Sequence, residues 1–160
     1  MLQLKYKVER VGTMKIYTSR YSNKELRTGR YTPVGITVGA PRFSLGYELK
    51  GNIRELAPFG SLFNVEDRRE FTEKYFAKMD KVGVSRVKAI FKQYERYGKD
   101  IVLLCYEDVR EPNEWCHRLV FAEWWKARTG EEITELEDPT PCKVKKPKAE
   151  TEKFDQMALF

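Results

Sequence analysis

The chain lacks any long apolar run and lacks the features of a secreted protein. No stretch of its 160 residues is apolar over the length that crosses a membrane. The first ten residues alternate apolar and charged side chains and lack the apolar core of a secretory signal. We therefore predict a cytoplasmic protein without a membrane partner.

Cysteine and histidine are scarce. The chain has three cysteines and a single histidine, His117. An odd and small number of cysteines is not the pattern of a disulfide-rich domain, so reduced thiols are expected. The apolar fraction of 41% predicts a folded core. The net charge of +6 is compatible with a nucleic-acid partner without being diagnostic of one.

The most informative stretch is 100–128. Residues 101–105 form a short run of branched apolar side chains, which predicts a buried central strand. A charged loop follows, and the apolar spacing after Cys116 predicts a helix that ends at Gly130. Open α/β sheets bind their ligands where a strand end, a loop and a helix start meet, so we expect the functional site here.

The other predicted elements alternate in the order of an α/β protein. They are strands at 14–18, 33–38 and 133–136, an extra edge strand within 1–13, and helices from 64 or 67 to about 81 and at 85–97. This order predicts one three-layer domain over residues 1–138, with a mostly parallel sheet flanked by helices. Residues 44–65 have no pattern from which a fold can be predicted.

Arginines follow several of these predicted strands and suggest an anion pocket. In this interpretation Arg20, Arg42 and Arg118 converge on a phosphate, with Ser19 beside them. Planar guanidinium groups contact a phosphate at two points, and a helix start favours an anion. The sequence therefore offers these four residues as ligand-binding candidates.

Two other chemistries and one structural role suit the same stretch. Glu107 or His117 could act as a general acid or base, and Cys105 or Cys116 as a nucleophile activated by the nearby arginine and the helix start. Cys105, Cys116 and His117 are ligand types for zinc. The adjacent Cys-His pair is unlike Cys-x-x-Cys spacing and no fourth ligand is evident, so no metal or other cofactor is expected. In the structural alternative, Cys105 is simply buried, and His117 and Arg118 pair with Glu107.

Aromatic side chains near arginines have two interpretations. They could stack on the bases of single-stranded nucleic acid, or they could close a small core. We expect Phe43 in the core and leave Tyr21 and Tyr47 open. At least one of Trp124 and Trp125 should be buried, because consecutive helical residues point about 100° apart.

The composition changes after Asp138. Residues 139–155 are rich in proline and lysine, which predicts a disordered linker. The chain then ends in residues 156–160, QMALF, which resemble the sliding-clamp-binding motif of bacterial replication and repair proteins. Gln156, Leu159 and Phe160 match that motif, and Met157 stands in for its usual leucine. The resemblance implies docking to the bacterial sliding clamp on a linker that reaches about 50 Å at roughly 3.3 Å per residue. The alternatives are that the five residues match by chance or that they fold back onto the domain.

Four short motifs lie at predicted strand ends and at the helix start. They are Tyr17-Thr-Ser-Arg20, Gly39-Ala-Pro-Arg42, Leu103-Leu-Cys105-Tyr-Glu107 and Cys116-His-Arg118. Together they resemble the domain-of-unknown-function 488 family over about residues 14–138. The chain departs from that family at 17–21, where the family has Thr-Ile-Gly-His-Ser, and at 37–39, where it has Asp-Val-Arg, so it resembles a divergent branch. The resemblance implies a cytoplasmic α/β domain with a polar pocket that acts on nucleic acid or nucleotides.

These observations predict a DNA-associated protein whose pocket binds nucleic acid or a nucleotide and whose tail recruits it to the sliding clamp. Enzymatic activity is left open. A nuclease-like or base- or nucleotide-processing reaction would use Cys105, Glu107, Cys116 and His117. The alternative is a binding module without turnover that sequesters a nucleotide ligand or a protein partner.

Overall fold

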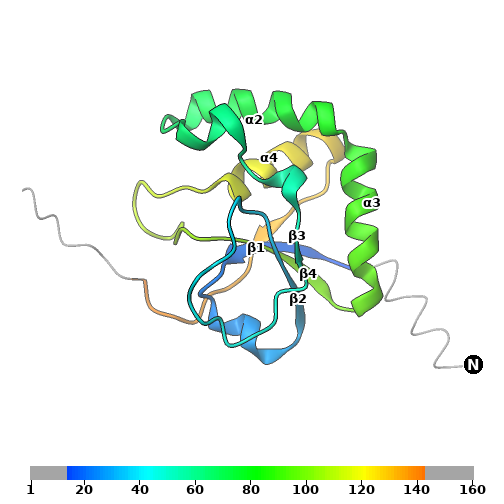
Figure 1. Ribbon diagram of the computed structural model, residues 1–160, viewed down its shortest axis with the longest axis vertical. Helices are drawn as coiled ribbons and strands as arrows, with labels where there is room; N and C mark the ends of the chain where they lie inside the picture. The colour runs from blue at the N-terminus through cyan, green and yellow to red at the C-terminus, as the bar shows by residue number, and fades with distance from the viewer. Residues whose placement is uncertain (1–13, 143–160) are drawn as a thin grey trace, which may run out of the picture.

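The computed structural model describes residues 14–142, which form an α/β domain around a five-stranded sheet (Figure 1). Neighbouring strands are parallel and lie in the order β3-β2-β4-β1-β5. The strands are β1 (Ile16–Arg20), β2 (Tyr31–Gly35), β3 (Gly51–Asn52), β4 (Asp100–Cys105) and β5 (Thr134–Glu135). The predicted α/β class and parallel sheet are confirmed. The expected edge strand in 1–13, most of the expected linker and the C-terminal motif lie outside the described residues.

β4 lies at the centre of the sheet, as its apolar run predicts. Residues 101–105 are all buried, and the strand pairs with β1 on one side and β2 on the other. The register places Cys105 opposite Arg20 of β1, and Leu104 opposite Gly35 of β2. Because parallel strands end at the same edge, the residues that follow β1, β2 and β4 share one edge of the sheet.

One face of the sheet is covered by α2 (Arg68–Val82), α3 (Val84–Tyr94) and α4 (His117–Thr129) (Figure 1). The Asp67 side chain caps α2 by accepting from the Glu70 backbone N–H at 3.0 Å. Trp124 and Trp125 are both buried in the main core, which confirms the expectation for that pair. Each indole N–H donates to a carboxylate, so neither buried donor is left unsatisfied.

The other face carries a smaller apolar cluster, and no α-helix within residues 14–142 covers it. Its buried members include Tyr21, Leu26 and Leu104, and the 3-10 helix η1 (Lys24–Thr28) and the loop at 45–49 pack there. These segments replace the second helical layer that the element order suggests. The stretch 44–65 contains β3 and two further 3-10 helices, η2 (Arg54–Leu56) and η3 (Gly60–Asn64).

Candidate functional site

A pocket of about 850 Å³ lies at the carboxyl edge of the sheet, above the ends of β2 and β4 and beside the start of α4. Four segments of the chain line it: 37–43 after β2, 58–71 around η3, 105–107 after β4, and 115–117 before and at the start of α4. Cys105, Glu107, Cys116 and His117 are among the lining residues, as the strand-loop-helix pattern predicts. The candidate catalytic residues therefore lie together in one pocket.

The pocket also collects the apolar side chains that the fold exposes. Among residues 14–142, four large apolar side chains are exposed: Val38 (44%), Phe43 (48%), Phe63 (65%) and Tyr106 (42%). All four line the pocket. The expectation that Phe43 belongs to the core is wrong, because the loop after β2 follows the pocket and Phe43 packs with neither core cluster. Tyr21 is buried. Tyr47 is partly buried, and its hydroxyl donates to the backbone carbonyl of Tyr21 at 2.6 Å.

Sequence patterns did not identify Phe63 and Tyr106 as site residues. Phe63 lies in η3, inside the stretch without periodicity, and Tyr106 follows the central strand directly. The signal that identifies them is exposure, which depends on what the rest of the chain covers. Tyr106 is further positioned by its hydroxyl, which donates to the Gly39 carbonyl at 2.8 Å.

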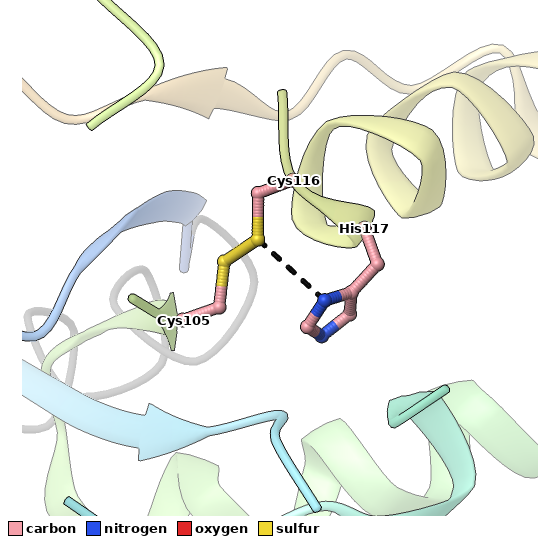
Figure 2. A group of neighbouring side chains, drawn as sticks. All are labelled: Cys105, Cys116 and His117. Carbon is pink, nitrogen blue, oxygen red and sulfur yellow. Dashed lines mark hydrogen bonds between the residues drawn. A yellow bond between two sulfur atoms is a disulfide. The ribbon is translucent and has the colours of Figure 1, made fainter. Parts of the chain in front are cut away.

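The two cysteines of the site are joined to each other (Figure 2). Cys105 is the last residue of β4 and Cys116 is the N-cap of α4. Their sulfurs form a disulfide, and their Cα atoms are 7.3 Å apart. This differs from the expected reduced thiols, because the loop between them returns to the strand end, which the spacing of 11 residues does not reveal. Cys142 is free.

The surroundings of His117 favour a neutral imidazole whose proton is on Nε2. Its Nε2 lies 2.5 Å from the Ile36 carbonyl oxygen, and a carbonyl can only accept, so Nε2 carries the proton. Nδ1 therefore has a lone pair, and it lies 3.5 Å from Cys116 Sγ (Figure 2). Burial lowers the pKa of His117 to about 4, and the charges of Arg118 and Lys78 lower it as well. Near neutral pH, His117 is a base or a ligand and not an acid.

Arg118 does not face the pocket, contrary to the anion-pocket prediction. It is 1% exposed, its Nε donates to both oxygens of Glu135 at 3.0 and 3.2 Å, and its Nη1 donates to Cys105 Sγ at 2.8 Å. Glu135 also accepts from the Thr18 hydroxyl at 3.1 Å. A guanidinium so placed favours the thiolate form of Cys105 whenever that sulfur is reduced.

Arg20 and Ser19 also have partners within the fold. Arg20 pairs with Asp138 at 2.7 Å and with Asp108 at 3.6 Å, and the buried Ser19 hydroxyl accepts from Asn23 Nδ2 at 2.9 Å. The expected convergence of three arginines on a phosphate therefore does not occur. Arg42 is the arginine of that set that lines the pocket.

Glu107 completes the polar part of the pocket. Its side chain is exposed, and its Oε2 lies 3.6 Å from Cys105 Sγ. A carboxylate, a neutral imidazole with a free lone pair and two sulfurs thus meet at one wall of an apolar pocket. This set can transfer protons, attack an electrophile from a reduced sulfur, or hold a soft cation.

Comparison with family models, curated proteins and solved structures finds no match for this chain. Within residues 14–142, no helix has the length and apolar character needed to span a membrane.

Proposed function

We propose that the pocket binds a nucleobase, presented by a nucleotide or by single-stranded nucleic acid, and that the protein acts in association with DNA. The observation that carries the proposal is that all four large apolar side chains exposed within residues 14–142 line one pocket. A soluble domain seldom gathers its exposed apolar side chains without a ligand to cover them.

The kind of side chain supports a flat ring as the ligand. Phe43, Phe63 and Tyr106 offer aromatic faces, and a base stacks on such a face whatever its sequence. Arg42 lines the same pocket and is exposed, and no carboxylate within residues 14–142 pairs with it. A free guanidinium beside aromatic faces suits a ligand that combines a base with a phosphate.

The sulfur wall of the pocket supports processing of the bound group. Cys105, Glu107, Cys116 and His117 lie where they would contact a ligand stacked on the aromatic side chains. A base- or nucleotide-processing reaction would use neutral His117 and Glu107 for proton transfer. The alternative, a binding module that sequesters the ligand, needs only the aromatic residues and Arg42.

Substitution of Phe63 tests the proposal. We expect Phe63→Ala to weaken binding of a labelled single-stranded oligonucleotide by about 1–3 kcal/mol, or roughly 5- to 150-fold in Kd, through the loss of one stacking face. Fluorescence anisotropy at fixed salt measures it. The free energy of unfolding should change by less than about 0.5 kcal/mol, because the side chain is 65% exposed.

Tyr97→Ala is the matched control. Tyr97 is an aromatic residue with two cations near its ring, Lys50 at 5.3 Å and Arg96 at 4.9 Å, and it does not line the pocket. Its substitution should leave the Kd unchanged. Equal loss of affinity in both variants, or no binding of oligonucleotide or mononucleotide by the unaltered protein, would contradict the proposal.

We further propose, from the sequence resemblance of Gln156, Met157, Leu159 and Phe160, that the tail docks to the bacterial sliding clamp. These residues lie outside the described part of the chain, so the support is the motif and the Pro- and Lys-rich segment before it. Deletion of residues 156–160 should abolish binding to purified clamp in a pull-down or by surface plasmon resonance. Clamp binding that survives the deletion, or none by the full chain, would refute it.

A further inference from the structure

We propose that Cys105, Cys116 and His117 bind Zn²⁺ when the two cysteines are reduced. Sγ of each cysteine and a ring nitrogen of His117 all lie within 4.8 Å of one another, and all three residues are buried. Two thiolates and an imidazole are the donor set that zinc prefers. This site does not depend on the nucleobase proposed above.

Two ligand-to-ligand distances fit a tetrahedral ion. Zinc bonds of about 2.3 Å to sulfur and about 2.0–2.1 Å to nitrogen place the two donors about 3.6 Å apart at the tetrahedral angle. Cys116 Sγ and His117 Nδ1 are 3.5 Å apart. Glu107 Oε2 is 3.6 Å from Cys105 Sγ, which is the corresponding separation for a carboxylate ligand. Glu107 is thus a candidate fourth ligand beside Cys105, and its carboxylate would have to move toward Cys116 and His117, because the donor atoms that lie within 4.8 Å of one another belong to the other three residues alone.

The surroundings hold the donors in the form that a metal needs. The Nε2–H of His117 donates to the Ile36 carbonyl, so the lone pair is on Nδ1 and is directed at the sulfurs (Figure 2). A backbone acceptor on the far ring nitrogen is the usual support of a metal-binding histidine. Arg118 Nη1 donates to Cys105 Sγ at 2.8 Å, which stabilises a thiolate there.

The disulfide and the metal site are two exclusive states of the same sulfurs. The Cα atoms of Cys105 and Cys116 are 7.3 Å apart, slightly beyond the separation usual for a disulfide, and this leaves room for an ion between two separate sulfurs. A dithiol or phosphine reductant breaks the S–S bond by supplying two electrons, and two protons complete the thiols. Binding of Zn²⁺ then releases both protons, and a thiol oxidant reverses the sequence.

The ion would face the pocket, because all four donor residues line it. Three of the donors are buried and Glu107 is exposed, so a water or a ligand atom can displace the carboxylate. A site with three fixed protein ligands and one exchangeable position is typical of catalytic zinc and not of structural zinc.

Cobalt titration of the full chain in two redox states tests the site. The protein is reduced with a phosphine, freed of reductant under nitrogen, and titrated with Co²⁺, whose thiolate charge-transfer and tetrahedral d–d bands report the donor set. We expect these bands to saturate at one ion per chain, to vanish on addition of Zn²⁺, and to be absent from the disulfide form. No bands in the reduced protein, or the same binding in both redox states, would overturn the proposal.

Variants locate the ion. Cys105→Ser and Cys116→Ser should each abolish the bands, whereas Cys142→Ser should leave them unchanged. Cys142 is the matched control because it lies with Asp108 and Glu111 in a second group of possible metal ligands, so bands that arise from that group would be lost in Cys142→Ser. Loss of the bands in Cys142→Ser, with retention in the other two, would overturn the assignment. The two redox states of the unaltered protein keep the test valid where a serine variant fails to fold. No nucleotide is present, so failure here and failure of base binding are distinguishable.

Discussion

The two halves of the carboxyl edge of the sheet differ in whether their arginine side chains form ion pairs within the fold. Above β2 and β4 the edge opens into the apolar pocket, with Arg42 exposed among aromatic side chains. Above β1 and β5 the edge is filled by ion pairs, in which Arg20 contacts Asp108 and Asp138, and Arg118 contacts Glu135. Neighbouring strand ends in one sheet therefore carry an open apolar pocket on one side and a network of ion pairs on the other.

The charged groups above β1 and β5 also affect one another's ionisation and connect separate segments of the chain. Hydrogen bonds from the Arg110 side chain lower the pKa of Asp108 to about 2, and the charge of Arg20 lowers it too. Arg110 also donates to the Asp138 and Thr140 carbonyls at 3.2 and 2.6 Å, which ties the chain after β5 to the loop after β4.

An arginine that follows a strand is therefore a ligand-binding candidate only when no carboxylate within the fold pairs with it. Arg20 and Arg118 follow the expected pattern in sequence, but their charges are already compensated. Arg42 has no such partner within residues 14–142 and lines the pocket. A bidentate contact to a phosphate is available to Arg42 without breaking an existing ion pair.

Substitution within the ion pairs above β1 and β5 should have the largest effect on the free energy of unfolding. Glu135→Gln removes the carboxylate that pairs with Arg118, which is 1% exposed, and leaves that buried charge without its ion-pair partner. We expect a loss of about 3 kcal/mol in the free energy of unfolding, at the low end for a buried pair because the Glu135 side chain is 30% exposed. Urea denaturation measures it, and oligonucleotide affinity of the folded variant should be unchanged.

Glu132→Gln is the control for that variant. Glu132 pairs with Lys126 at 3.1 Å, and both side chains are more than 60% exposed, so we expect a change within about 0.5 kcal/mol. Equal destabilisation by the two substitutions would show that the buried pair of Arg118 and Glu135 has no special role, and would remove the distinction between the two halves of the edge.

A smaller effect should appear in how the free energy of unfolding changes at acid pH. Asp108 has a folded pKa of about 2, below its ordinary value of 3.8, so its charge stabilises the fold above about pH 4. That stabilisation declines as the pH falls below about 4 and is lost as the pH passes through about 2. We expect Asp108→Asn to be less stable than the unaltered protein by about 0.2–1 kcal/mol above pH 4, and most of this difference to be gone near pH 2.

Denaturation of both proteins at several pH values between 2 and 7 measures that difference. A gap that stays constant from pH 7 down to pH 2 would contradict the ionic origin of the effect, because at pH 2 Asp108 is almost fully protonated in the unfolded chain and about half protonated in the folded protein. Such a result would instead assign the difference to a hydrogen bond that the amide fails to make.

Part of the site was predictable because its position follows from local patterns. The run at 101–105 and the spacing after Cys116 predict β4 and α4, and parallel topology then places Cys105, Glu107, Cys116 and His117 at one edge. The pairing of the arginines was not predictable, because Glu135 and Asp138 come from a short final segment whose contacts are long-range. The exposure of Phe43 and Phe63 depends equally on what the rest of the fold leaves uncovered.

Local sequence patterns are sufficient to predict the α/β class, the central strand, the helix behind it, and the position of the two cysteines, Glu107 and His117 near one strand end. These follow from apolar periodicity and from the geometry of parallel sheets, which act over short stretches of chain. Three other features follow from the packing of the whole domain: which arginine of the predicted site has no carboxylate partner within residues 14–142, which aromatic residues remain exposed, and how close the two sulfurs lie to His117. Each of these depends on distances between residues far apart in the chain, and local patterns contain no information about such distances.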